Sequence, residues 1–196
     1  MDILKIDPEK YFKFDFSTGK IAYAENPGRA IIVPVEALRE FAKVQASDEP
    51  HKSFYNLGIC VGRYFGEILS KLYNHRGMED DIRPEEFLND LNGLLSLHGL
   101  GLMTMETWGE VLLFDWEILV ESNLMTSDFQ EGVLAGTLRE FSRKEFEVAT
   151  VENGSRKRGK FLAGNTQMVK CARQWVEEGA GTGEIVVRLK NGLHLR

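Results

Sequence analysis

The sequence predicts an α+β protein in which helices cover an antiparallel sheet and a β-hairpin lies at the amino terminus. Three observations predict this class. Short runs alternate apolar with polar residues, which is the period of a half-buried strand. Longer runs place apolar residues at helical spacing. The predicted helices and strands arrive in blocks, and this order favours an antiparallel sheet over a parallel one.

The first thirty residues predict the hairpin. Phe12, Phe14 and Phe16 alternate with polar residues, a Ser-Thr-Gly segment at 17–19 interrupts the pattern, and residues 21–24 resume it. A turn and a short apolar run then precede Pro34, and proline is typical of a first helical turn. A helix is therefore expected over residues 34–46.

Two further helices are predicted before the sheet. Residues 51–73 repeat apolar side chains at helical spacing beside a row of three glycines. Residues 84–98 begin with a proline and two glutamates, which suit the positive end of a helix dipole. The inner face of this second helix is expected to consist of Phe87, Leu91, Leu94 and Leu95.

Strands at 100–107 and 110–120 are expected to form a hairpin. On its second strand one face carries only large apolar residues and must be buried: Leu112, Phe114, Trp116, Ile118 and Val120. Asp115 and Glu117 are expected on the opposite, solvated face. A helix at 127–142, strands at 146–152 and 161–163, a helix at 166–177 and a last strand at 184–190 complete the chain. The glycine-rich linker at 179–183 is the candidate hinge.

Composition excludes several classes of function. The chain has 196 residues, 43% of them hydrophobic, and this is enough to fill a core. Its net charge of −6 argues against nucleic acid and anionic lipid as partners. Cys60 and Cys171 lie among apolar residues and are expected to be small buried hydrophobes. No secretory leader or membrane span is recognisable, so a reducing cytoplasm is the expected location.

Two sets of glycines predict close backbone contacts. Gly132 and Gly136 are four residues apart and share one face of their predicted helix, as Gly58, Gly62 and Gly66 do earlier. Such faces let another helix approach closely. The spacing fits a homodimer in which two copies of one helix cross, and it equally fits a crossing of the two helices within one chain.

The glycine helix and the strands after it resemble a known family. Residues 127–136, Phe146-Glu147-Val148, Glu152, Ser155 and Gly159 resemble the vinyl-reductase-type small-molecule-binding domain. That superfamily contains the sensor domains of phenol- and xylene-responsive transcription activators and is related to subunits of the TRAPP vesicle-tethering complex. Segments at 19–21, 28–35 and 57–62 extend the likeness upstream, so it covers roughly residues 16–163.

The chain is expected to consist of three parts, and the resemblance, which leaves the C-terminal helix and strand without a counterpart, implies a change in metal binding. We expect an N-terminal hairpin extension over 1–30, a sensor-like core over 31–164, and a C-terminal helix and strand over 165–196 packed on that core. Zinc-binding members of the family use cysteines at positions that correspond here to Ser127, Ser155 and Ala163, and a glutamate that corresponds to Glu152. Hydroxyl and methyl groups cannot replace thiolate ligands, so this zinc is not expected. No other cofactor is expected either, because the sequence carries no cofactor motif.

The resemblance also implies a small apolar or aromatic ligand between the helices and the sheet. We expect its contacts at His98, Met103, Trp108, Phe114, Trp116 and Phe129. The imidazole of His98 could bond a polar group of the ligand, or it could simply bond the backbone at a helix end. The aromatic residues could line a pocket, or they could be ordinary core.

No catalytic group stands out. Glu106, Asp115 and Glu117 are expected to be solvated surface, and neither cysteine has a histidine close in sequence to activate it. A basic run of Arg156, Lys157, Arg158 and Lys160 could hold an acidic partner or a phosphate, or it could be a solvated turn.

We therefore expect a non-enzymatic regulatory protein that binds a ligand and acts on a protein partner, since no output domain is recognisable beside the sensor-like region. A homodimer is expected. The alternative is a dimeric interaction or scaffold protein of the TRAPP-subunit kind with a filled core.

Overall fold

The computed structural model describes residues 11–15, 17, 20–24, 29–30, 50–76, 83–109, 111–117, 127–153 and 158–193. The elements, in chain order, are β1 (Phe12–Asp15), β2 (Lys20–Tyr23), β3 (Arg29–Ala30), α2 (Pro50–Arg76), α3 (Pro84–Leu97), β4 (Leu102–Thr107), β5 (Leu112–Glu117), α4 (Ser127–Ser142), β6 (Glu147–Asn153), β7 (Arg158–Gly164), α5 (Thr166–Glu177) and α6 (Thr182–Leu193). The predicted α+β class is confirmed. The helix expected over 34–46 lies outside the described residues.

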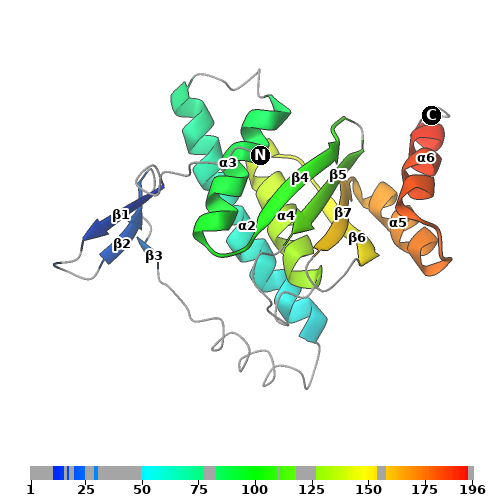
Figure 1. Ribbon diagram of the computed structural model, residues 1–196, viewed down its shortest axis with the longest axis horizontal. Helices are drawn as coiled ribbons and strands as arrows, with labels where there is room; N and C mark the ends of the chain where they lie inside the picture. Colours follow the sequence, from blue (N-terminus) through cyan, green and yellow to red (C-terminus); the bar gives the residue numbers. More distant parts are fainter. Residues whose placement is uncertain are drawn as a thin grey trace.

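Two antiparallel sheets are present in the described part of the chain. β1, β2 and β3 form a small sheet at the amino terminus, which confirms the predicted hairpin. β4, β5, β7 and β6 form the main sheet in that order, with every pair antiparallel. Figure 1 shows α2, α3 and α4 on one side of the main sheet and α5 and α6 on the other.

Helices lie on both sides of the main sheet, and each face contributes to a buried apolar cluster. Phe114 and Trp116 on β5 face the core beneath α2, α3 and α4, whereas Val111 and Leu113 lie in a second cluster with residues of α5 and α6. The expectation that Asp115 faces solvent was wrong. Its carboxylate is 4% exposed, because Arg158 on the neighbouring strand covers it and pairs with it through Nε and Nη2 at 2.6 Å.

The predicted glycine faces bring α2 and α4 into backbone contact. A Cβ atom added at Gly62 would lie 2.0 Å from the Val133 carbonyl oxygen, and one added at Gly132 would lie 2.2 Å from that of Tyr55. At Gly58, Gly136 and Gly66 an added Cβ would lie 2.3, 2.5 and 2.7 Å from a backbone carbonyl oxygen of the opposite helix. All five glycines are therefore used in a crossing within the chain, and their faces are covered by the chain's own helices.

The N-terminal hairpin docks on α3. The ring of Tyr11 lies against Gly93, where an added Cβ would be 2.5 Å from the Tyr11 hydroxyl oxygen. That hydroxyl donates to the buried carboxylate of Asp90 at 3.4 Å. Phe12 is also buried, and its ring lies 5.3 Å from that of His98. The hairpin is thus tied to the helix that leads into β4.

The C-terminal segment differs from the prediction. The strand expected over 184–190 is the helix α6, and the glycine linker is the tight turn between α5 and α6. Gly179 has a φ of +86° and ends α5, because its N–H and that of Ala180 bond back to carbonyls in the last turn. Ile185 and Leu189 are buried against α5, and Val187 between them is exposed. This is a helical pattern, since a strand would place all three on one face.

Two smaller observations complete the fold. Cys60 was expected to be buried, but it is exposed on α2. The reason is that the glycines of α2 face α4, and Cys60 lies on a different side of the helix. Cys171 is half-buried.

No helix among the described residues is long and apolar enough to cross a membrane.

Candidate ligand-binding site

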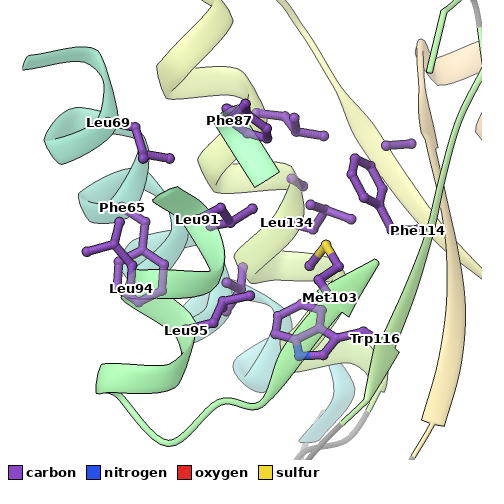
Figure 2. Close-up of a cluster of buried hydrophobic side chains, with 14 of the residues drawn as sticks. Phe65, Leu69, Phe87, Leu91, Leu94, Leu95, Met103, Phe114, Trp116 and Leu134 are labelled. Carbon is purple, nitrogen blue, oxygen red and sulfur yellow. The ribbon is translucent and has the colours of Figure 1, made fainter. Parts of the chain in front are cut away.

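Three of the expected ligand contacts come together on the helix-covered face of the main sheet. Met103 on β4 is paired in register with Trp116 on β5, and Met105 with Phe114. Met103, Phe114 and Trp116, here called the β4–β5 cluster, are at most 1% exposed. Figure 2 shows them facing Leu134 of α4 and Leu95 of α3. The alternation read from the sequence places these three side chains on one face, and the register then makes them neighbours.

Trp116 is fixed in orientation. Its indole Nε1–H donates to the carbonyl oxygen of Leu100 at 2.8 Å, and its ring lies 5.9 Å from that of Phe161 on β7, edge to face. The hydrogen bond satisfies the single polar atom of the ring and ties it to the segment that joins α3 to β4. The aromatic wall of the cluster is therefore held in place.

His98 lies at the end of α3 and is bonded to backbone. Its Nδ1 is 2.7 Å from the Leu94 carbonyl oxygen, and its ring packs 4.8 Å from the ring of Phe65 on α2. Burial lowers the pKa of His98 below its ordinary value and outweighs the hydrogen bond to the Leu94 carbonyl, which raises it. Because a carbonyl oxygen only accepts, the Nδ1–H of His98 is the donor in this contact. Figure 2 shows Phe65 on α2, away from Met103 and Trp116.

Trp108 lies apart from the cluster, and Phe129 packs at the edge of the core that contains it. Trp108 follows β4 at the turn into β5, the opposite end of this hairpin from Trp116, and it is 46% exposed. Its ring lies 6.0 Å from that of Phe87 on α3. Phe129 is half-buried near the start of α4 and packs at the margin of the core. The structure therefore separates Trp108 from Met103 and Trp116, and it leaves a contact of Phe129 with the ligand as an expectation.

Sequence reasoning missed two buried polar residues, one bonded to the cluster and one on the face of α4 that carries Leu134. Asn92 on α3 forms two hydrogen bonds with the backbone of Met103, and its side chain is almost completely buried. Gln130 on α4 is 4% exposed. Helical spacing could have found it, because it lies four residues before Leu134 and therefore on the same core-facing side.

The other face of the sheet carries ion pairs rather than a basic binding site. Arg158 is committed to Asp115, and Lys160 contacts Glu106 at 2.8 Å. The hydrogen bond to Glu106 raises the pKa of Lys160. Arg158 and Lys160 therefore both form ion pairs within the chain, which fits a surface turn better than a site for an acidic partner. Arg156 and Lys157, the other members of the basic run, lie outside the described residues.

The positions that correspond to zinc ligands in the resembling family carry a glutamate, two serines and an alanine, and the described ones have the following surroundings. Ala163 belongs to the core beneath α2, α3 and α4. Glu152 contacts Lys160 and Thr182 towards the other face of the sheet. Ser127 begins α4, and Ser155 lies outside the described residues. Across the described ranges, no three His, Cys, Asp or Glu side chains gather in a way that could hold a metal ion.

Comparison with protein-family models and with curated proteins gives no match. Among solved structures, the chain is similar to the phenol-responsive sensory domain of the transcription activator PoxR, crystallised with phenol. The TM-score is 0.62 at 15% sequence identity, over 85% of this chain and 90% of that one. The chain shares the fold of this sensory domain.

A second similar structure is a vinyl-4-reductase family protein from Methanocaldococcus jannaschii, with a TM-score of 0.42, 19% identity, and coverage of 68% of this chain and 82% of that one. The likeness to the PoxR sensory domain, and not this second one, confirms the predicted resemblance at the level of the fold. The likeness to the PoxR domain includes most of the chain, although identity is low.

Proposed function

We propose that this protein is a non-enzymatic sensor that binds a small apolar or aromatic molecule at the β4–β5 cluster and signals through a protein partner. The observation that carries the proposal is the shared fold with a phenol-responsive sensory domain, over nearly the whole of both chains. Met103, Phe114 and Trp116 lie between the sheet and the helices that cover it.

The chemistry of the cluster suits an aromatic ligand. Trp116 and Phe114 offer ring faces and edges for stacking, and such contacts add to the free energy of apolar burial. In the structure the cluster is closely packed, so a ligand enters by displacing side chains. Met103 is suited to this, because its unbranched thioether adopts several rotamers at low cost.

The described members of the cluster include no acid, base or nucleophile, and this favours binding over catalysis. Signalling then requires an element that changes position when the ligand binds. The backbones of α2 and α4 are in direct contact where the helices cross, so we expect these two helices to move as one unit. α3 leads directly into β4 and carries the docked hairpin, and we assign the movement to this unit. The same proposal places the protein in the cytoplasm, where it acts as a homodimer.

The packed cluster also supports a rival function. Side chains that fill the core completely are what an interaction or scaffold protein of the TRAPP-subunit kind would need. In that case the fold would be retained without a ligand, and the protein would act through its surfaces.

A thermal-shift experiment separates the two functions. The probes are phenol, toluene and cyclohexane, measured on the wild-type protein and on Met103→Trp, which fills the cluster. Val187→Trp is the control, because Val187 is exposed on α6. At about 100 times its dissociation constant, a ligand stabilises the fold by roughly 2.7 kcal/mol, which raises Tm by about 5–10 °C. We expect this shift for wild type and Val187→Trp and not for Met103→Trp. If no probe shifts the wild-type Tm, the filled-core function is favoured.

A further inference from the structure

Gln130 is a buried amide on the ligand side of α4. It lies one helical turn before Leu134 and on the same face. Figure 2 shows Leu134 pointing from α4 towards Met103 and Phe114. Gln130 is 4% exposed, and its amide nitrogen Nε2 has no hydrogen-bond partner among the residues that the structure describes.

The neighbouring polar groups of α4 are satisfied. The Glu131 carboxylate accepts hydrogen bonds from the backbone N–H and hydroxyl of Thr150, and it pairs with Arg173. The Thr137 hydroxyl donates to the Val133 carbonyl at 2.8 Å. Within α4, the orphaned buried donor is therefore at Gln130 and is not a general feature of the helix.

An orphaned buried donor is costly, because the group loses its hydrogen bonds to water and gains none in return. A leucine at this position would avoid that cost. The chain instead keeps an amide on the face of α4 from which Leu134 reaches the cluster. The cost is recovered when a bound molecule brings an acceptor to Nε2, and a small aromatic compound with an oxygen substituent does so.

We propose that Gln130 donates its Nε2–H to an oxygen acceptor of the ligand and so selects oxygenated aromatic molecules over hydrocarbons. The inference rests on the proposed sensor function and adds its polar contact. In this arrangement Met103, Trp116 and Leu134 contact the aromatic ring of the ligand. Gln130 forms the hydrogen bond to its oxygen substituent. A hydroxyl or carbonyl oxygen on the ring is accepted, and a methyl group in its place leaves the amide unpaired.

The test compares two probes that differ in one group. Dissociation constants of phenol and toluene are measured by calorimetry on wild-type protein, on Gln130→Leu, and on Gln174→Leu. Gln174 is a suitable control because it is exposed on α5, where it bonds Glu178. We expect wild type and Gln174→Leu to prefer phenol by about 3- to 10-fold, the value of one neutral hydrogen bond. Gln130→Leu should lose this preference through weaker phenol binding.

A second readout needs no ligand. Removing the orphaned donor should raise the Tm of ligand-free Gln130→Leu by about 2–4 °C. A fall in Tm would mean that the amide has a structural partner, and it would overturn the inference. Unchanged phenol preference in Gln130→Leu would overturn it too, while leaving the sensor function intact. Failure of both probes to bind wild-type protein would instead reject the aromatic-sensor proposal and this inference together.

Discussion

The side chain of Asn92 forms two hydrogen bonds with the backbone of Met103 on the edge strand β4. Its side-chain oxygen accepts a hydrogen bond from the Met103 N–H at 2.7 Å, and its side-chain nitrogen donates to the Met103 carbonyl at 2.8 Å. The amide of a helix residue thus replaces the backbone of an additional strand. Because β4 is an edge strand, these two groups would otherwise be buried without partners. The contact also fixes α3 to the strand that carries the cluster.

We therefore expect Asn92→Ala to lower the free energy of unfolding by about 2–4 kcal/mol, since two hydrogen bonds are lost and two buried backbone groups remain unpaired. Urea denaturation measures this change. Asn89→Ala is the control, because Asn89 is exposed on the same helix and should cost less than about 0.5 kcal/mol. Equal costs for the two variants would contradict the role assigned to Asn92.

Gly62 provides a second prediction. Replacing Gly62 by leucine, or even by alanine, would place a Cβ atom against the backbone of Val133. Because the obstacle is backbone and not a side chain, the clash can be relieved only by moving the two helices apart. Gly62→Leu should therefore prevent folding, as judged by circular dichroism and size-exclusion chromatography. Gly183→Ala is the matched control, because a Cβ there meets nothing within 4 Å; it should stabilise α6 by about 0.5–1 kcal/mol. A folded, monomeric Gly62→Leu would instead indicate that this face joins two copies of the chain.

The stability of the fold should depend on pH through His98. Burial lowers the pKa of His98 in the folded protein, whereas the unfolded chain has the ordinary value near 6.5. As pH falls through that value, the unfolded state takes up the proton first, so stability decreases until the folded-state pKa is passed. Urea midpoints between pH 7 and pH 5 measure this. His98→Gln should show a smaller decrease than wild type, and an equal decrease would assign the effect to other groups.

The sequence predicted those parts of the fold and site in which local pattern and tertiary environment agree. Alternation along β5 correctly placed Phe114 and Trp116 on a buried face, and glycine spacing correctly predicted close backbone contact. It could not show whether Gly58 to Gly66 met another chain, because spacing describes a surface and not its partner. The burial of Asp115 also escaped prediction, since it depends on Arg158, 43 residues away.

The candidate site was predicted in part for the same reason. Met103, Phe114 and Trp116 follow from strand period and register. Trp108 was grouped with them because aromatic character alone was considered, but it lies at the other end of the hairpin. Gln130 was missed because a polar residue in a helix is ordinarily read as surface, and only the packing around α4 shows that it is buried.

The C-terminal segment gives the last prediction. Its β-branched run favours a strand by propensity, yet burial of Ile185 and Leu189 against α5 makes it a helix, because tertiary packing outweighs a weak local preference. In a helix, Ile185→Ala should cost about 2–4 kcal/mol, whereas Val187→Ala, at a position 56% exposed, should cost less than about 0.5 kcal/mol. In a strand, the two side chains would share one face and their losses would be similar. Urea denaturation of both variants therefore distinguishes α6 from a strand, and comparable losses would contradict the helix.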